Sequence, residues 1–155
     1  MNLSRITART LRRVFRIWPP FVFSGIRVEA WSDDWRYARV RLNKSWYSRN
    51  FVGTLFGGSL FAMTDPFWMI MTLQSLGPDY IVWDKAGEIE FVAPGRERVF
   101  AEFRLEDSVL DEIRAATAGG EKYLRWFEAD VKTAGGEVIA RVRKQIYVRR
   151  KRSAS

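Results

Sequence analysis

The chain has 155 residues, of which 47% are hydrophobic and 15% aromatic, so it suits one domain with a sizeable core and is not disordered. It contains neither cysteine nor histidine, which excludes disulfides, thiolate or histidine metal sites, and catalysis by either residue type. The formal net charge of +8 favours an anionic partner: a phosphorylated cofactor, a nucleic acid or a membrane surface.

A basic amphipathic helix is predicted first, over residues 4–18. Leu11, Phe15 and Trp18 lie at approximately helical spacing with arginines between them, and Pro19 ends the pattern. We expect the apolar side of this helix to pack against the rest of the domain, with a position on a membrane surface as the alternative. The arginines interrupt every apolar run, so the segment resembles neither a signal peptide nor a spanning helix.

Two strands follow in hairpin order. Residues 26–30 and 37–42 each alternate apolar residues with charged ones, which indicates half-buried strands. After them, residues 43–50 read as a loop that exposes Trp46 and Tyr47.

The chain then becomes almost wholly apolar, and a long central helix is predicted from Gly57 to Leu76. Its first N–H groups have no intrahelical partner and suit an anion or a polarised carbonyl. Asp65 stands about two turns further on, at roughly 1.5 Å rise per residue. An ionised group there is costly unless it is paired or used, so Asp65 either caps or pairs within a buried helix or carries a function. Pro66 removes a backbone donor, so a bend is expected beside Asp65.

Four more strands and a short helix complete the predicted order. The strands cover residues 80–92 (with a bulge at Gly87), 99–105, 123–132 and 137–149; the helix covers 108–118, with Ser108 as its N-cap. Consecutive strands favour antiparallel pairing. The fold class is therefore α+β, a curled antiparallel sheet around a long central helix, in one domain over residues 1–150 with a basic tail at 151–155.

This order, the pattern Asn50-x-x-Gly53-x-x-Phe56-Gly57-Gly58 and the position of Asp65 together resemble the hotdog-fold acyl-CoA thioesterases. The similarity is greatest to the phenylacetyl-CoA/hydroxybenzoyl-CoA type. The aromatic-x-x-Pro segment that begins at Phe91 fits the same family. The N-terminal basic helix is similar to an uncharacterised branch, the domain of unknown function 4442. The resemblance covers most of the chain, from residue 25 to 149.

The resemblance implies catalysis at a dimer interface, in a dimer or a pair of dimers. The backbone N–H of Gly58, with Gly57, would polarise the thioester carbonyl, and Asp65 of the facing subunit would activate water or attack directly. Asn50 would hold the loop or the water. Asp84 falls where relatives place a polar residue near the catalytic water; a surface or structural role is the alternative.

Two features bear on the substrate. Phe56 replaces the usual histidine of the family beside the carbonyl site, so one polar group is lost there. Arg96 and Arg98 follow the turn after the strand and could contact coenzyme A phosphates, or be ordinary exposed arginines. No metal and no cofactor is expected, apart from coenzyme A as part of the substrate.

Two hypotheses follow. The first is a thioesterase acting on an acyl- or aryl-CoA or an acyl-carrier-protein thioester; the second is a non-catalytic hotdog module that binds acyl-CoA or a protein partner. We expect a cytoplasmic protein. A nucleic-acid partner is not expected, because no nucleic-acid motif accompanies the charge, and a membrane-surface role would rest only on the basic ends.

Overall fold

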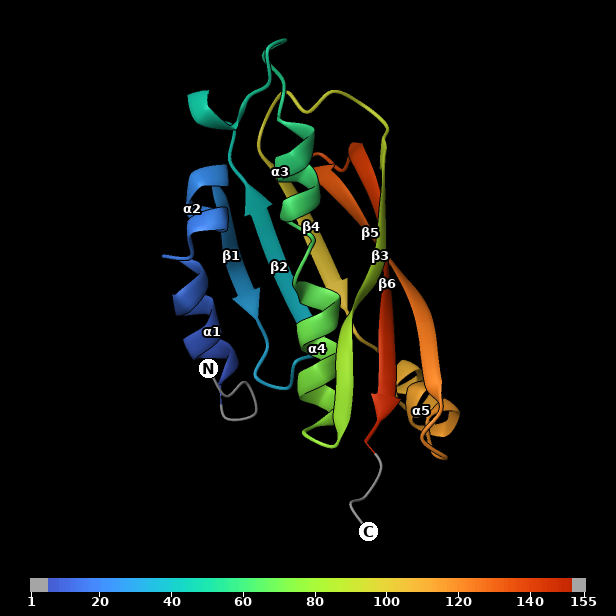
Figure 1. The fold of residues 1–155 in the computed structure, drawn as a ribbon. Helices are drawn as coiled ribbons and strands as arrows, with labels where there is room; N and C mark the ends of the chain where they lie inside the picture. Colours follow the sequence, from blue (N-terminus) through green and yellow to red (C-terminus); the bar gives the residue numbers. More distant parts are fainter. Residues whose placement is uncertain (1–5, 152–155) are drawn as a thin grey trace.

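A computed structural model describes residues 6–151 (Figure 1). Its six strands follow one another in the order predicted from the sequence. The helices are α1 (Ala8–Phe15), α2 (Pro19–Ser24), α3 (Gly57–Ala62), α4 (Phe67–Leu76) and α5 (Asp107–Ala116), with a 3₁₀ turn, η2 (Trp46–Ser48). The strands are β1 (Ile26–Trp31), β2 (Tyr37–Leu42), β3 (Tyr80–Phe91), β4 (Val99–Arg104), β5 (Lys122–Thr133) and β6 (Val138–Arg150).

The strands form one antiparallel sheet in the order β1-β2-β4-β5-β6-β3. Each hairpin predicted from the alternating pattern is present: β1 pairs with β2, and β5 pairs with β6 around a turn at Gly135 and Gly136. β3 lies at one edge and pairs only with β6 among the described strands. The edge strand therefore leaves one row of backbone groups without a ladder partner.

The two central helices lie end to end across one face of this curved sheet (Figure 1). Alternate residues of β2, β4, β5 and β6 point at them and are buried. Half of the residues of α4 are buried as well, including Phe67 and Met71 at 0% exposure. The α+β architecture predicted from the sequence, a curled antiparallel sheet around an apolar helix, is thus confirmed.

The N-terminal helix differs from the prediction in length. α1 covers only Ala8–Phe15 with Thr7 as its N-cap, and its buried side, which includes Leu11 and Phe15, packs on β1 as expected. α1 ends at Phe15, before Pro19. Pro19 and Pro20 begin α2, because proline is favoured in the first helical turn, where its missing N–H costs nothing. Residues 4 and 5 of the predicted helix and 152–155 of the predicted tail lie outside the described residues.

Two local predictions are wrong. The bulge in β3 lies between Asp84 and Ala86 rather than at Gly87. Gly87 is instead a site of close packing, because a Cβ atom there would lie 2.6 Å from the ring of Phe61. The N-cap of α5 is Glu106 and not Ser108, since the chain turns into the helix directly from β4.

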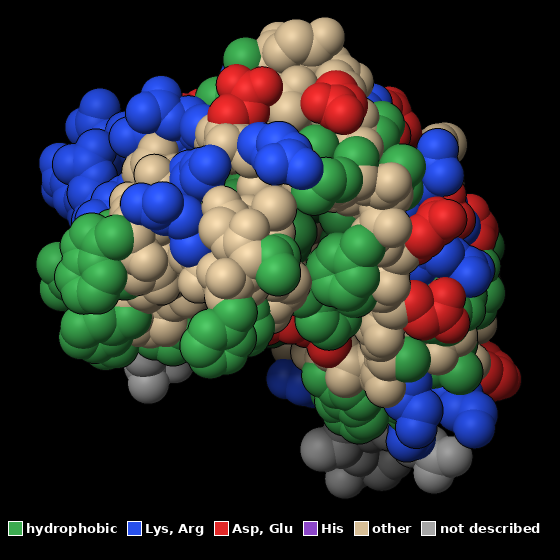
Figure 2. Space-filling model, turned by 90° about the horizontal axis from the view of Figure 1, so that it is seen from above, with side chains coloured by type: hydrophobic (Ala, Val, Ile, Leu, Met, Phe, Trp, Pro, Cys, Tyr) green, Lys and Arg blue, Asp and Glu red, His purple; other side chains and the backbone are tan. Residues whose placement is uncertain are grey.

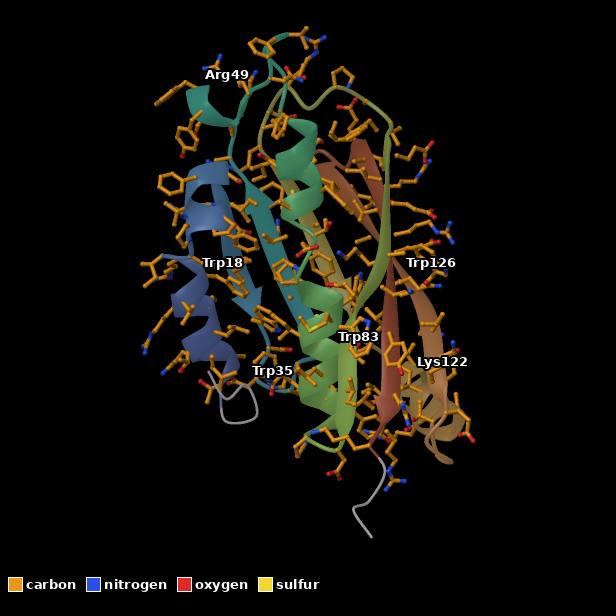
Figure 3. The ribbon with its side chains drawn as sticks, viewed as in Figure 1. Trp18, Trp35, Arg49, Trp83, Lys122 and Trp126 are labelled. Carbon is orange, nitrogen blue, oxygen red and sulfur yellow. The ribbon has the colours of Figure 1, made fainter. Side chains whose placement is uncertain are left out.

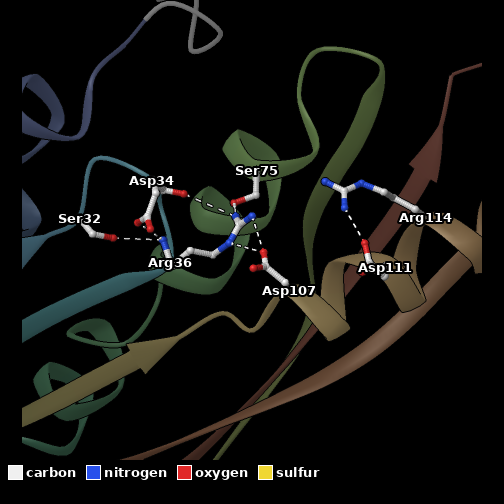
Figure 4. Close-up of polar contacts among 7 residues, drawn as sticks. All are labelled: Ser32, Asp34, Arg36, Ser75, Asp107, Asp111 and Arg114. Atoms are coloured by element: carbon white, nitrogen blue, oxygen red, sulfur yellow. Dashed lines mark hydrogen bonds and ion pairs between the residues drawn. The ribbon is translucent and has the colours of Figure 1, made fainter.

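Arg36 ties the far end of α4 to its neighbours (Figure 4). Its guanidinium donates to Ser75 Oγ at 2.5 Å and to Asp107 Oδ1 at 2.9 Å, and its backbone N–H is bound by Ser32 and Asp34. These bonds join the β1–β2 turn, α4 and α5. No helix within residues 6–151 is long and apolar enough to cross a membrane.

Candidate functional site

The central helix is interrupted at the predicted position. α3 ends at Ala62 and α4 begins at Phe67, and between them Met63–Pro66 form turns. Pro66 has no N–H to donate, and Thr64 Oγ1 bonds back to the carbonyl of Phe61 at 2.8 Å. Asp65 thus stands at a break between two helices, and its side chain is 56% exposed in the single chain.

Lys144, which was not among the predicted site residues, pairs with Asp65 and Asp84. Lys144 Nζ on β6 lies 2.6 Å from Asp65 Oδ1 and 3.8 Å from Asp84 Oδ2 on β3. The lysine side chain is only 6% exposed. A buried ammonium is costly unless it is paired, and these two carboxylates supply its counter-charge. We call Asp65, Asp84 and Lys144 the carboxylate–lysine cluster.

The packing around Lys144 fixes where its ammonium can go. Gly87 lies opposite Lys144 in the β3–β6 ladder, and a Cβ atom at Gly87 would lie 3.2 Å from Cδ of the lysine. The Nζ atom of Lys144 lies 5.3 Å from the centre of the Phe61 ring, within cation–π range. Gly87, the Phe61 ring and the lysine side chain therefore pack against one another.

The acidity of Asp84 is perturbed by its surroundings. Burial raises the pKa of its carboxyl to about 6; Lys144 opposes the rise and Asp65, a like charge, adds to it. Its Oδ1 atom is buried and has no hydrogen-bond partner within residues 6–151. A carboxylate with one dry oxygen is less stable ionised, which explains the direction of the shift. This side chain can therefore exchange a proton near neutral pH.

The two glycines predicted to polarise a carbonyl lie at the start of α3. Gly57 and Gly58 are its first two residues, where helix geometry supplies no acceptor for the N–H groups. A Cβ atom at Gly57 would lie 2.8 Å from the Phe91 ring, and one at Gly58 would overlap the Phe56 ring. Both rings are more than half exposed. The absence of side chains at the two glycines is therefore what allows the rings to lie against the helix start.

Asn50 holds the loop that leads to α3. Its Oδ1 accepts from the N–H groups of Val52 and Thr54, and its Nδ2 donates to Thr54 Oγ1 at 2.8 Å. The side-chain amide is therefore used in shaping the loop. Asn50 and Gly57 together line a pocket of about 400 Å³, which is also lined by the last residue of β3, Phe91, and by residues 92–95 after it.

The two predicted arginines belong neither to the lining of this pocket nor to the carboxylate–lysine cluster. Arg96 and Arg98 are exposed in the loop between β3 and β4. Lys44 Nζ donates to the carbonyl of Arg96 at 2.8 Å, which fixes the loop backbone rather than the guanidinium. Arg98 lies beside Lys44 and Asn43 at a shallow hollow.

Apart from the two arginines, the predicted residues gather in two places within one chain. Asn50 and Gly57 line the pocket, with Gly58 and Phe56 at the same helix start. Asp65 and Asp84 meet at Lys144, beyond the other end of α3. Among residues 6–151 no group of three or more acidic side chains is placed to hold a metal ion.

A sequence signal for Lys144 does exist. Val142, Ile146 and Val148 are the inward, buried positions of β6, and Lys144 occupies the same row. In an alternating strand a lysine at an inward position needs a buried partner. That rule would have directed attention to Asp65 and Asp84 as the available carboxylates.

Comparison with known proteins places the chain in a family. Residues 7–148 match the family described as Domain of unknown function (DUF4442), so the chain belongs to it. None of the curated proteins compared with the chain matches it.

Solved structures share the fold. A protein of unknown function from Pseudomonas aeruginosa, described as "Probable Thioesterase", superposes with a TM-score of 0.82 at 20% identity, over 94% of this chain and 97% of that one. A thioesterase from Haemophilus influenzae gives 0.67 at 14% identity, over 92% and 90%. A mutant thioesterase from Pseudomonas aeruginosa gives 0.65 at 16% identity, over 96% and 99%. The fold is that of the thioesterase-like hotdog proteins, as the motifs in the sequence indicated.

Proposed function

We propose that this protein hydrolyses an acyl-CoA or acyl-carrier-protein thioester at a site shared between two subunits. The observation that carries the proposal is the Asp65 carboxylate, which is exposed at the helix break and held through Oδ1 by the buried Lys144. A carboxylate that is fixed in place but still accessible suits a general base or a nucleophile. The likeness to thioesterase structures supports the same reaction class.

In the proposed reaction, the thioester carbonyl approaches the N–H groups of Gly57 and Gly58. These donors stabilise the negative charge that develops on the carbonyl oxygen. Asp65 of the facing subunit takes a proton from water as the water oxygen bonds to the carbonyl carbon. The carbon–sulfur bond then breaks, and the leaving thiolate takes up the proton that Asp65 accepted. In the alternative course, the Asp65 carboxylate bonds to the carbonyl carbon and expels the thiolate, and water then hydrolyses the resulting mixed anhydride.

A site shared between two subunits would explain why the pocket and the carboxylate–lysine cluster are separated within one chain. The pocket at the start of α3 and the carboxylate–lysine cluster lie at opposite ends of that helix. A second subunit that packs against the β3 edge would bring its own Asp65 towards the first subunit's pocket. The exposed Phe56 and Phe91 beside the pocket are apolar surface that such a partner would cover.

A non-catalytic acyl-CoA-binding module is the second candidate, and Phe56 favours it. In the resembling enzymes a histidine precedes the glycine pair. Here a phenyl ring packs against Gly58, at the position where the carbonyl would have to approach. A ring that stays there would leave the pocket able to hold an acyl chain but unable to polarise its carbonyl.

Thiol release from short, long and aromatic acyl-CoAs tests both candidates. The enzyme hypothesis expects hydrolysis of at least one of them, lost in Asp65→Asn. Calorimetry with the same compounds measures binding separately. Binding without hydrolysis by the unaltered protein would establish the module and reject the enzyme. Hydrolysis at equal rates by Asp65→Asn would reject the assignment of Asp65.

A further inference from the structure

The net positive charge of this protein is confined to one part of the chain. Residues 1–64 contain 11 Lys and Arg but 3 Asp and Glu, whereas residues 65–155 contain 15 of each. The excess of +8 therefore comes wholly from the first 64 residues, which include α1, α2 and the loop that carries η2. Figure 1 shows these three segments along one side of the molecule.

The outward side of α1 is basic. Leu11 and Phe15 face the core, while Arg9, Arg13 and Arg16 are exposed. None of these three arginines forms an ion pair with an acid in the described part of the chain, in contrast to the paired arginines on the outer face of the sheet. Their charge is therefore available to an external anion.

Large apolar side chains protrude beside these arginines. Ile17 at the end of α1 is 78% exposed, Phe23 on α2 is 78% exposed, and Trp46 on η2 is 82% exposed. α2 and η2 are packed together, and Gly25 lies against the ring of Tyr47, so Phe23 and Trp46 are exposed on neighbouring elements. Figure 2 looks onto the end of the molecule that carries η2. It shows hydrophobic side chains next to a group of Lys and Arg.

We propose that this surface docks on an anionic lipid membrane. We call it the basic aromatic face and define it by Arg9, Arg13, Arg16, Ile17, Phe23 and Trp46. The arginines would contact lipid headgroups while Ile17, Phe23 and Trp46 enter the boundary between headgroups and acyl chains. Tryptophan is favoured at that depth because its ring is apolar and its N–H remains hydrated.

The chemistry of the face favours a lipid over a nucleic acid. A nucleic acid would use the same arginines and could stack on Trp46. An exposed isoleucine gains nothing from stacking, but it gains from transfer into a bilayer. The face shares no residue with the lining of the pocket or with the carboxylate–lysine cluster, so docking does not depend on the proposed hydrolysis.

Co-sedimentation of the full chain with vesicles tests the inference. The vesicles contain phosphatidylcholine alone or with about one third phosphatidylglycerol. We expect binding only to the anionic vesicles, weakened as salt rises above about 0.1 M. Arg13→Gln with Arg16→Gln should weaken binding about 30-fold, at about fivefold for each arginine. Phe23→Ser with Trp46→Ser should weaken it about tenfold or more.

A matched control lies on the other side of the molecule. Lys122 is on β5, far from the Trp18 and Arg49 side (Figure 3). Lys122→Gln with Leu124→Ser, both exposed positions, should leave vesicle binding unchanged. All of these side chains are exposed, so the variants should fold; near-UV circular dichroism checks this.

Three results would overturn the inference. The first is no binding to anionic vesicles, or equal binding to neutral ones. The second is tight binding to single-stranded RNA or duplex DNA that the face variants abolish, with no vesicle binding, which would assign the face to nucleic acid. The third is a loss of self-association in Phe23→Ser with Trp46→Ser by sedimentation velocity, again without vesicle binding, which would make the face a contact between copies of the chain.

Discussion

The ammonium of Lys144 and the carboxylate of Asp65 lie 2.6 Å apart although 79 positions separate them in sequence. The contact joins the break in the central helix to the middle of β6. Lysine is the buried member of the pair and aspartate the exposed one. The core therefore orients a carboxylate that remains open to solvent.

Replacing Asp65 by Asn should keep the fold and remove hydrolysis. The amide has the same shape but neither accepts a proton at neutral pH nor acts as a nucleophile. We expect thiol release from the best acyl-CoA substrate to fall by about two to four orders of magnitude. Asp79→Asn, at an exposed carboxylate in the turn after α4, is the control and should retain full activity.

Lys144→Met keeps the buried stem and removes the ammonium. If Lys144 positions Asp65, kcat should fall by about ten- to a hundredfold, the range expected for a misplaced catalytic group, with little change in KM. In an Asp65→Asn background the same substitution should have no further effect on kcat. A further fall in the double variant would mean that the lysine serves the fold and not the carboxylate.

Asp84 should make stability depend on pH. Its folded-state pKa of about 6 lies above the ordinary value of 3.8, so the folded protein binds this proton more tightly than the unfolded chain does. The stabilising contribution of the protonated form is full below about pH 4 and is lost as the pH rises through about 6. The full loss is of the order of 3 kcal/mol, of which about 2 kcal/mol falls between pH 4.5 and pH 7.

Urea unfolding of Asp84→Asn isolates this term. The neutral amide cannot ionise, so the variant should not lose this free energy of unfolding between pH 4.5 and pH 7. Relative to the unaltered protein, its free energy of unfolding at pH 7 should be higher by about 2 kcal/mol when the two are compared with their values at pH 4.5. Asp79→Asn should not alter the difference. An unchanged pH dependence in Asp84→Asn would show that this carboxyl titrates as an ordinary one.

Gly58→Val should abolish hydrolysis by placing a side chain where the thioester carbonyl must approach the backbone. Because a Cβ atom there also displaces the Phe56 ring, the double variant Gly58→Val with Phe56→Ala separates the two effects. Blocked approach predicts that the double variant stays inactive. Recovery of activity would mean that movement of the phenyl ring, and not access to the N–H groups, was the cause.

Assembly should be at least dimeric. One edge of β3 has no ladder partner in the described chain, and Phe56, Phe91 and Val92 near its end are exposed. Light scattering at micromolar concentration should give twice the mass of the chain, and Phe91→Lys should shift the population towards monomer. Leu124→Lys on β5 is the control. A monodisperse monomer of the unaltered protein would contradict both the dimer and the shared site.

Much of the fold follows from period-two alternation in the strands and from the all-apolar central stretch. What the sequence leaves open is which partner an inward polar residue meets. The apolar neighbours of Asp65 indicated that its carboxylate needed a task or a partner, but the partner came from a strand far along the chain. Long-range pairings of this kind depend on the order of strands, and local patterns do not determine that order.

Two local predictions differ from the structure for a similar reason. Glycine often marks a bulge, which predicts one at Gly87, yet the missing side chain there admits the Phe61 ring. Proline cannot continue a helix, which predicts a stop at Pro19, yet this residue begins α2. In both cases the residue type is compatible with two local structures, and a contact from elsewhere in the fold selects one.

The rings in the core give the protein an intrinsic optical signal. Phe15 on α1 stacks on Trp31 at 5.9 Å, Trp31 contacts Phe67 at 5.2 Å, and Phe67 stacks on Phe103 at 4.5 Å. Ring contacts thus run without a gap from the N-terminal helix through β1 and α4 to β4. Detachment of α1 would remove the Phe15 ring from Trp31 and change its asymmetric environment, so the near-ultraviolet circular dichroism of the unlabelled chain reports on docking of its N-terminal segment in real time.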